Sequence, residues 1–559
     1  MRLTFHKNGS FFHAAAILAL VLILVVGLCT YPHYGLTFDE RVERFTSIVN
    51  YQYILQKLFG LELRIVDKDL TEWPDQYYGV AFQLPMVFVE HTTSFSMPQH
   101  DVFVMRHLCT FLYCFAGWIC LYLFLQKVFQ DRRLSLLGLL MAVLYPRIWG
   151  DQFNNIKDMV FTACCCASLL MIALCLEKRS WRREVSAALV FALCVNTRVV
   201  GLMFPLLLMG YRILMAIWQK KPLVKECLLA VAQVALVLVF YFCLTPAAWE
   251  QPLSFLPNVI QTFSRFEAWG GSLPFLGEMV PGQQVPWYYI PVWLLISLPI
   301  WYLLLLLVGV IGQGCSLFVS LRGKKAREWF LSSQRYGLLC FVIAFVPMAT
   351  MLFKQVTLYN GWRHVYYIFP CLITLMLFGV RDGYRLMEGR QPLRRAACAL
   401  MAFLLIGQGV WIAKEHPFEK VYFNPVGRAI ADTVDRDYWG ESLYKQFQII
   451  LQNDPSEEIK ILDYNGCLGI YRSYLTEEEK ARVTMIACTE PVEETDAEYL
   501  IDLEDTVGPE VFSDDFVKVY TEYVDGISIC NIYIRREVLL ERFGLSPEKD
   551  GDIAWTFHP

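Results

Sequence analysis

The sequence predicts a polytopic α-helical membrane protein with a small α/β domain at its C-terminus. Of its 559 residues, 56% are hydrophobic and only 18% are charged, which is too apolar for a single soluble domain. Apolar runs long enough to cross a bilayer recur throughout residues 1–413. Residues 414–559 are polar and acidic, so we predict a domain boundary near Lys414.

About eleven apolar runs approach the roughly 20 residues that a helix needs to span a bilayer. The first run follows a short basic segment and lacks a small-residue cleavage pattern, so we predict an uncleaved helix rather than a signal peptide. The fifth and sixth runs are short, and we expect them to be tilted, broken or partly re-entrant. The predicted spans are 12–30, 106–126, 134–149, 159–176, 184–199, 201–218, 226–246, 287–313, 336–353, 363–380 and 396–413.

Basic residues in the short loops predict the orientation, because cytoplasmic loops collect Lys and Arg. Arg2 and Lys7 precede the first span, and with a cytoplasmic N-terminus every inside loop is basic. These positions hold 22 of the 49 basic residues. An odd number of spans precedes residue 414, so the C-terminal domain is predicted to lie outside the plasma membrane.

The predicted outer domain, residues 414–559, has 31 acidic and 14 basic residues, whereas the membrane part has 22 acidic and 35 basic residues. Topology explains this asymmetry, so no nucleic-acid partner is predicted. Residues 442–451 suit an amphipathic helix, and 459–463 and 499–503 suit short strands. Residues 517–524 and 527–534, joined by Asp525-Gly526, predict a β-hairpin with a type I′ turn.

The cysteines and histidines do not form a recognisable metal site. Of the 18 cysteines, 15 fall in residues 1–413, mostly in apolar runs where a thiol packs as a small apolar group. The outer domain has only Cys467, Cys488 and Cys530, an odd number without C-x-x-C spacing. The nine histidines are scattered. Metal ligands therefore stay unknown, and a Mg²⁺ or Mn²⁺ ion held by carboxylates stays open as a cofactor.

Ionisable residues gather in the segments predicted to face outward, where they usually indicate a functional site. Asp39 and Glu40 follow the first span, and Asp158 ends the predicted loop 146–158. A carboxylate can deprotonate an attacking hydroxyl, and an arginine can hold a leaving phosphate. The candidate phosphate contacts are Arg198, Arg363, His364 and Arg147.

The same residues also have structural explanations. Asp39 and Glu40 can cap a helix over 41–58, and Asp158 can cap the next span. The arginines can extend to the membrane interface. Asp151 is interpreted as a solvated loop residue, and the aromatic cluster 287–289 as part of an interfacial belt.

Four stretches give the chain a resemblance to the GT-C superfamily of integral-membrane glycosyltransferases, in particular its bacterial branch of protein mannosyltransferases and aminoarabinose transferases. They are Thr37-Phe38-Asp39-Glu40, the loop ending Asn154-Asn155-Ile156-Lys157-Asp158, the run Pro286 to Trp293, and Tyr359 to Pro370. Residues 415–425 and 437–440 resemble the beginning of the outer domain of bacterial members. The resemblance covers nearly the whole chain, although each motif alone is loose.

The resemblance implies a GT-C fold, a polyprenyl-phosphate sugar as donor, an acceptor hydroxyl outside the cytoplasm, and inversion at the anomeric carbon. Asp39 matches the catalytic acid of the first loop, Glu40 its neighbour, and Asp158 the second acidic motif. The acceptor can be a glycan, a lipid or a protein, and the outer domain is unlike the repeats of eukaryotic protein mannosyltransferases.

Two other functions remain open at this point. A transporter or flippase of a lipid-linked saccharide would also place charges near a membrane cavity, but the inverted repeats typical of such proteins are not evident. A non-catalytic scaffold of the cell envelope could use the acidic domain to recruit partners.

Overall fold

The computed structural model describes residues 9–92, 97–265, 269–464, 468–488, 495–503, 515–545 and 554–555. Arg2, Lys7 and Cys467, on which parts of the predictions rest, lie outside these residues. Within the described residues, nine helical segments are long and apolar enough to cross a membrane. The prediction of a multi-pass helical membrane protein is confirmed.

Each of these nine segments overlaps a span predicted from the sequence. Two begin with a 3₁₀ turn: η3 (Val199–Leu202) leads into α9, and η6 (Arg363–Ile368) leads into α16. The long helices are α1 (Gly9–Thr30), α4 (Gln99–Phe129), α7 (Asp158–Glu177), α9 (Met203–Trp218), α10 (Leu223–Leu244), α13 (Ile300–Arg322), α15 (Gln334–Lys354), α16 (Phe369–Leu386) and α17 (Gln391–Glu415).

The two remaining predicted spans differ from regular membrane helices. The third is broken into α5 (Arg132–Val143) and α6 (Pro146–Asn154), which are bent by 67°. Pro146 starts a new helix at this point because proline fits the first turn of a helix but not its interior. The fifth forms one unbroken helix, α8 (Trp181–Thr197), whose 17 residues span about 25 Å, less than a bilayer core.

The eighth predicted span, one of the nine above, is divided at Pro299 into α12 (Tyr289–Ser297) and α13.

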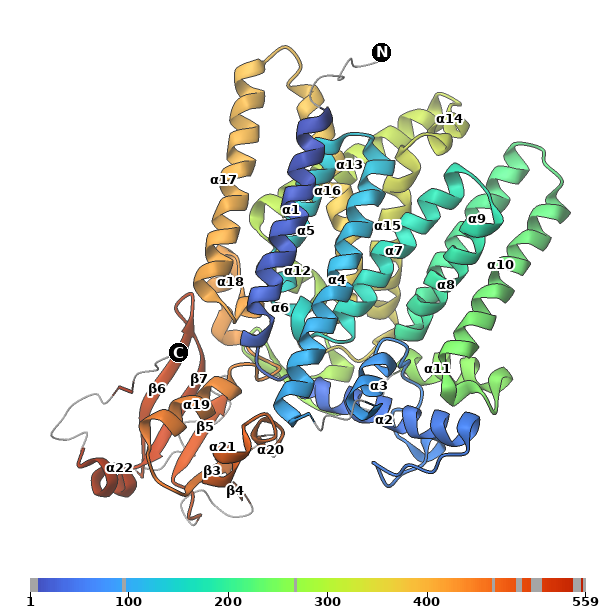
Figure 1. Ribbon diagram of the computed structural model, residues 1–559. Coiled ribbons are helices and arrows are strands. Elements are labelled where there is room, and N and C mark those ends of the chain that lie inside the picture. The colour runs from blue at the N-terminus through green and yellow to red at the C-terminus, as the bar shows by residue number, and fades with distance from the viewer. Residues whose placement is uncertain are drawn as a thin grey trace.

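One end of the helical bundle carries the surface elements that surround the candidate site. Figure 1 shows α2 (Phe38–Phe59), α3 (Leu84–Thr92), α11 (Pro252–Arg265) and the C-terminal sheet together at this end, below the bundle. The short helix α14 (Ala326–Leu331), which lies in a basic loop, is at the opposite end. The arrangement agrees with the predicted sidedness of the loops, although which side faces the cytoplasm stays a prediction.

The C-terminal part forms a mixed five-stranded sheet of order β4-β3-β5-β7-β6. Strands β4 and β5 each pair with β3 in parallel, and β5-β7 and β7-β6 are antiparallel. Asp525 and Gly526 both have positive φ (50° and 81°), as a type I′ turn requires, so the predicted hairpin is confirmed. The strands are β3 (Ile459–Asp463), β4 (Val483–Ala487), β5 (Tyr499–Leu503), β6 (Phe516–Val524) and β7 (Ile527–Arg535).

Short helices cover this sheet and connect it to the bundle. The predicted helix over 442–451 is observed as α19 (Leu443–Asn453), whereas β4 was not predicted. The connecting segment holds η7 (Glu419–Val421), α18 (Pro425–Arg428) and η8 (Ala431–Thr433). The other elements are α20 (Leu468–Arg472), α21 (Glu477–Arg482), α22 (Arg536–Phe543), η1 (Tyr31–His33), η2 (Leu70–Glu72), η4 (Pro246–Ala248), η5 (Gly282–Gln284) and the small hairpin β1 (Ser272–Phe275) and β2 (Glu278–Pro281).

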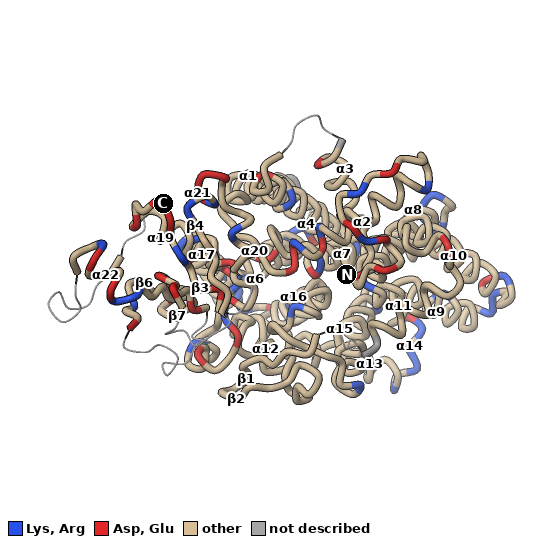
Figure 2. Tube along the Cα trace, turned by 90° about the horizontal axis from the view of Figure 1, so that it is seen from below, with Lys and Arg blue, Asp and Glu red and all other residues tan. Residues whose placement is uncertain are grey.

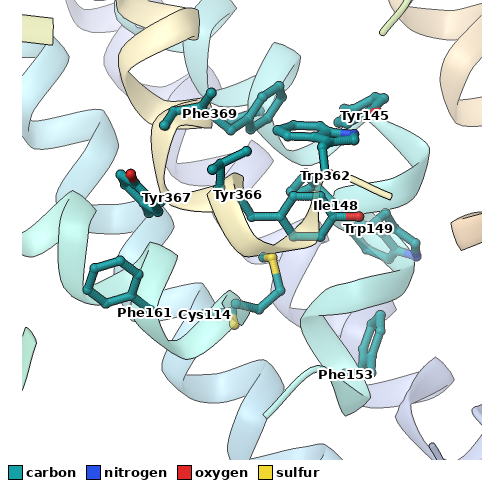
Figure 3. Packing of buried hydrophobic residues seen from close by; sticks show 14 of the residues in the cluster. Cys114, Tyr145, Ile148, Trp149, Phe153, Phe161, Trp362, Tyr366, Tyr367 and Phe369 are labelled. Atoms are coloured by element: carbon teal, nitrogen blue, oxygen red, sulfur yellow. The ribbon is translucent and has the colours of Figure 1, made fainter. Parts of the chain in front are cut away.

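The core of the membrane part is aromatic where α6 meets η6. Figure 3 shows Tyr145, Trp362, Tyr366 and Phe369 grouped at this point. The ring centroids of Trp362 and Tyr366 are 4.6 Å apart, and those of Tyr145 and Phe369 are 5.1 Å apart. This packing fixes the start of η6, which carries Arg363, against the bend before α6.

Helices α13 and α16 cross closely at two glycines, Gly309 on α13 and Gly379 on α16. A Cβ atom on Gly309 would lie 2.0 Å from the carbonyl oxygen of Leu375, which is backbone and cannot move aside. We expect Gly309→Ala to destabilise the protein by about 1–3 kcal/mol, since overpacking forces the helices apart. The thermal midpoint of the protein in detergent measures this effect. Gly314→Ala on the same helix, where an added Cβ has no neighbour within 4 Å, should leave the midpoint unchanged.

Candidate functional site

A cavity of about 520 Å³ opens between α2, η3, α10, α11, α15 and η6. One end is charged and includes Asp39, Glu43, Lys157, Arg198 and Arg363. Seen from the end of the molecule that carries the sheet, acidic and basic residues lie together around α2 and α7 (Figure 2). The lining also has an apolar wall, which includes Val199, Val200, Tyr241, Val259, Val346 and Met351. The cavity therefore joins a charged region to an apolar surface.

Asp39 lies in the first turn of α2, which begins just after Thr37. The Thr37 backbone N–H donates to the carboxylate of Glu40 at 2.8 Å, in a capping box that fixes the start of the helix. The side chain of Asp39 remains 40% exposed and accepts a hydrogen bond from Arg363 at 3.2 Å. An exposed carboxylate on a fixed helix end is a suitable acceptor for a substrate proton.

Asp158 begins α7 and is buried, with 1% of its side chain exposed. Its Oδ2 accepts a hydrogen bond from Nη1 of Arg363 at 3.1 Å, and its Oδ1 accepts one from Nη2 of Arg198. Asp158 does not line the cavity, whereas both arginines do. The buried carboxylate thus holds two arginines at the cavity wall.

The guanidinium of Arg363 contacts two aromatic rings. Its guanidinium carbon is 4.8 Å from the ring centroid of Tyr359 and 4.7 Å from that of Trp439. Nε of Arg363 and Nε of Arg198 have no hydrogen-bond partner in the described part of the chain. Each arginine therefore retains a donor beyond those bound by the carboxylates.

A second ion pair lies farther along α2. Lys157 contacts the carboxylate of Glu43, and its Nζ is 3.4 Å from the ring centroid of Tyr78. Burial raises the pKa of Glu43, although Lys157 opposes the shift, and burial also raises the pKa of Asp75. Glu43, Asp75 and Lys157 were not predicted as site residues from the sequence. Glu43 is four residues after Asp39, so helical spacing was the available signal for it.

The structure brings four of the seven predicted site residues to the cavity and separates three from it. Asp39, Arg198, Arg363 and His364 line the cavity. The ring of His364 packs against Tyr359, with centroids 4.7 Å apart. Asp158 does not line the cavity, but its carboxylate binds the two arginines that do.

Glu40 and Arg147 lie away from the cavity and have structural partners. Glu40 is buried, caps α2 and contacts Nε2 of His107 at 2.9 Å. Arg147 is buried in α6, stacks on Phe423 at 4.7 Å and donates to the Tyr422 carbonyl at 2.8 Å. Neither belongs to the site that we propose, because each side chain is turned to other groups.

The structure contradicts one structural interpretation made from the sequence, and it contradicts a second for one residue. Asp151 is fully buried in α6 rather than solvated, because the predicted loop 146–158 is mostly helix packed under the C-terminal part. The aromatic cluster is divided: Trp287 is 71% exposed, as a belt residue would be, while Tyr289 is buried and accepts the Gly361 backbone N–H at 3.1 Å.

The C-terminal part contacts the segment that leads to Asp39. Nδ2 of Asn154 donates to the Gly35 carbonyl at 3.0 Å and to Oε1 of Glu441 at 2.7 Å. Lys420 is 3.3 Å from Oε2 of Glu441. A Cβ atom on Gly35 would lie 2.3 Å from the Glu441 carbonyl oxygen, so only glycine fits this approach.

Glu441 makes the stability of this junction dependent on pH. Burial raises its pKa to about 8 from an ordinary 4.5, against the opposing effect of Lys420. Because the folded state binds the proton more tightly, this stability is complete below about pH 4.5 and is lost as the pH rises through about 8. The thermal midpoint of unfolding should therefore decrease as the pH is raised from 5 to 9.

Glu441→Gln should flatten this pH profile. Part of the slope should remain, since burial also raises the pKa of Asp435, to about 7. A profile of unchanged slope in Glu441→Gln would contradict the assignment.

The donor set does not fit a divalent cation. Asp39 and Asp158 are both engaged by Arg363, and in the described residues no group of three or more His, Cys, Asp or Glu side chains could hold a metal ion. We derive no step through a metal. The 17 cysteines of the described part are free thiols, and Cys164, Cys165 and Cys166 are buried in α7.

Residues 85–249 match a family model described as dolichyl-phosphate-mannose-protein mannosyltransferase. Over these residues, the match supports the predicted resemblance. The matched segment includes Asp158 and Arg198 but not Asp39 or Arg363. A search of curated protein sequences gave no match.

The chain is also similar to crystal structures of the ArnT protein from Cupriavidus metallidurans. The apo structure has 12% sequence identity and a TM-score of 0.42, and the match covers 93% of this chain and 98% of that chain. The structure bound to undecaprenyl phosphate has 12% identity and a TM-score of 0.44, covering 94% of this chain and 98% of that chain.

Proposed function

We propose that this protein transfers a sugar from a polyprenyl-phosphate-linked donor to an acceptor hydroxyl at the outer face of the membrane, with inversion at the anomeric carbon. One observation carries the proposal: the exposed carboxylate of Asp39 lies beside Arg363 in a cavity that is lined by charged residues and by an apolar wall. The match to a family named for a dolichyl-phosphate sugar supports the same donor class.

The cavity suits a donor that has both a phosphate and a long apolar chain. The apolar wall can contact the polyprenyl chain, and the arginines can hold the phosphate through charge-assisted hydrogen bonds. Lys354, at the end of α15, also lines the cavity, and its side chain has neither an ion pair nor a hydrogen bond within the described ranges. Unlike Arg198 and Arg363, it is not already neutralised by a carboxylate.

The proposed reaction is an in-line displacement. Asp39 accepts the proton of the acceptor hydroxyl, whose oxygen then attacks the anomeric carbon from the face opposite the phosphate. The bond between the anomeric carbon and the phosphate oxygen breaks, and its electron pair leaves with the polyprenyl phosphate. Arg198, Arg363 and Lys354 stabilise the charge that develops on the leaving group. Asp158 contributes by holding the two arginines.

A transfer assay tests the function. The purified full-length protein in proteoliposomes is incubated with a polyprenyl phosphate carrying a labelled sugar, one sugar at a time, and with cell-envelope material as acceptor. We expect label to enter the acceptor and free polyprenyl phosphate to accumulate in equal amounts. Movement of the label across the bilayer without transfer would instead identify a flippase. If the label is neither transferred nor moved with any donor, a scaffold is favoured.

Lys354→Ala should raise the apparent KM for the donor about tenfold, because a charged hydrogen bond to phosphate is lost. Its kcat should change less, since the arginines remain at the reacting centre. Lys324→Ala is the matched control, because this lysine lies in the basic loop after α13, at the opposite end of the bundle. An unchanged KM in Lys354→Ala would remove Lys354 from the phosphate site.

A further inference from the structure

The C-terminal part supplies one of the two rings that enclose Arg363. Trp439 is 3% exposed, and its ring centroid is 4.7 Å from the guanidinium carbon. The other ring, Tyr359, belongs to the membrane part and stacks on Trp269 with centroids 4.2 Å apart. A guanidinium between two aromatic faces is attracted to both, most strongly where water is excluded.

Trp439 is itself fixed within the C-terminal part. Its carbonyl oxygen accepts the Tyr471 hydroxyl at 2.5 Å. The carboxylate of Asp437 accepts the backbone N–H groups of Glu441 and Ser442 at 3.0 and 2.8 Å, which closes a tight turn around Trp439. Gly440 has φ of +67°, and a Cβ there would lie 2.6 Å from the Tyr471 oxygen. The orientation of the indole is therefore set by the fold of the turn.

The contacts around Trp439 lead back to the segment that carries Asp39. Nζ of Lys420 lies 5.0 Å from the Trp439 ring centroid and 3.3 Å from Glu441. Glu441 accepts a hydrogen bond from Asn154, which also binds the carbonyl of Gly35, four residues before Asp39. Arg363, which contacts Trp439, in turn donates a hydrogen bond to Asp39. The base and the arginine are thus both held by the same C-terminal turn.

We propose that Trp439 is a positioning residue for Arg363, and that the C-terminal part completes the transfer site rather than serving as a separate outer domain. The role of Arg363 in transfer rests on the proposed function. Trp439 touches neither donor nor acceptor in this proposal, and it acts by keeping the guanidinium in line with Asp39 and Asp158.

A double-mutant cycle of thermal midpoints tests the contact without any substrate. Trp439→Leu keeps an apolar side chain but removes the aromatic face, and Arg363→Met removes the cation. If the contact is as described, the double variant should be destabilised less than the sum of the single changes, by on the order of 2 °C. Arg363→Lys, which loses the planar stacking surface, replaces Arg363→Met if the latter does not fold. Additive midpoints would overturn the contact.

The transfer assay tests the positioning role. Trp439→Leu should lower kcat about tenfold with less than a twofold change in the donor KM, because small misplacements of a fixed group are costly in the reacting complex. Trp439→Phe keeps an aromatic face and should recover most of the rate. Trp329→Leu is the matched control, since Trp329 is also buried but lies on α14 at the other end of the bundle.

The outcomes separate this inference from the proposed function. An equal loss of rate in Trp439→Leu and Trp439→Phe would show that only packing volume matters and would overturn the positioning role. If the native protein transfers no sugar while the midpoints are coupled, the proposed function fails and the contact stands. If the native protein transfers sugar and Trp439→Leu has the native kcat, the inference fails and the proposed function stands.

Discussion

Asp39→Asn is expected to lower sugar transfer about 1,000-fold while leaving the folded protein and its donor affinity nearly unchanged. General bases contribute roughly 10²- to 10⁴-fold to enzymatic rates, and asparagine keeps the shape of the side chain without its basicity. Asp39 is 40% exposed, and its one ion pair among the described residues is with Arg363, so the change breaks few buried contacts. The rate is measured with saturating donor, and the donor affinity is measured separately by equilibrium binding.

The control for this change is Asp101→Asn, an exposed carboxylate in the first turn of α4 that does not line the cavity. It should transfer sugar at the native rate. If Asp39→Asn also kept the native rate, the base would have to be another carboxylate. Glu43 and Asp75 line the same cavity with raised pKa values, so each would then be changed to its amide in turn.

Asp158→Asn is expected to destabilise the protein by about 3–5 kcal/mol and to abolish transfer. Removing one partner of a buried ion pair leaves the other charge uncompensated. Here the loss affects both Arg198 and Arg363, and Asp158 is only 1% exposed, so water cannot replace the carboxylate. A lower thermal midpoint and loss of the monodisperse fraction in detergent would show the effect.

A second variant separates the stabilising role of Asp158 from its role in transfer. Asp158→Asn combined with Arg198→Met removes one of the uncompensated cations and should recover part of the lost stability without restoring transfer. If Asp158→Asn alone were as stable as the native protein, Asp158 would not be the residue that holds the two arginines.

Much of the membrane architecture could be predicted from the sequence, because apolar length and loop charge are local properties. All eleven predicted spans correspond to helices, including the short α8 and the bent pair α5 and α6. The bend and the burial of α6 were not predicted. Arg147, Asp151 and Asn154 look like residues of a polar loop. The partners of Arg147 and Asn154, Tyr422 and Glu441, lie more than 270 residues away in the chain.

The charged residues of the site were predicted from the sequence, but the ion pairs between them were not. The sequence placed Asp39, Asp158, Arg198 and Arg363 on one side of the membrane, and the structure joins them through Arg363 and Arg198. Glu40 was predicted as a site residue, but it caps α2 instead. Its spacing from Thr37 is that of a capping box, and this signal was available in the sequence. The contribution of Trp439 had no local signal, since it depends on how two distant segments pack.

The position of a bound polyprenyl phosphate is the most direct test of the proposed site. A structure of the full-length protein with this lipid should show phosphate oxygens within hydrogen-bond distance of Lys354 and at least one of Arg198 and Arg363. The chain of the lipid should follow the apolar wall near Val200 and Met351. A phosphate bound outside this cavity, in a protein that still transfers sugar, would contradict the account.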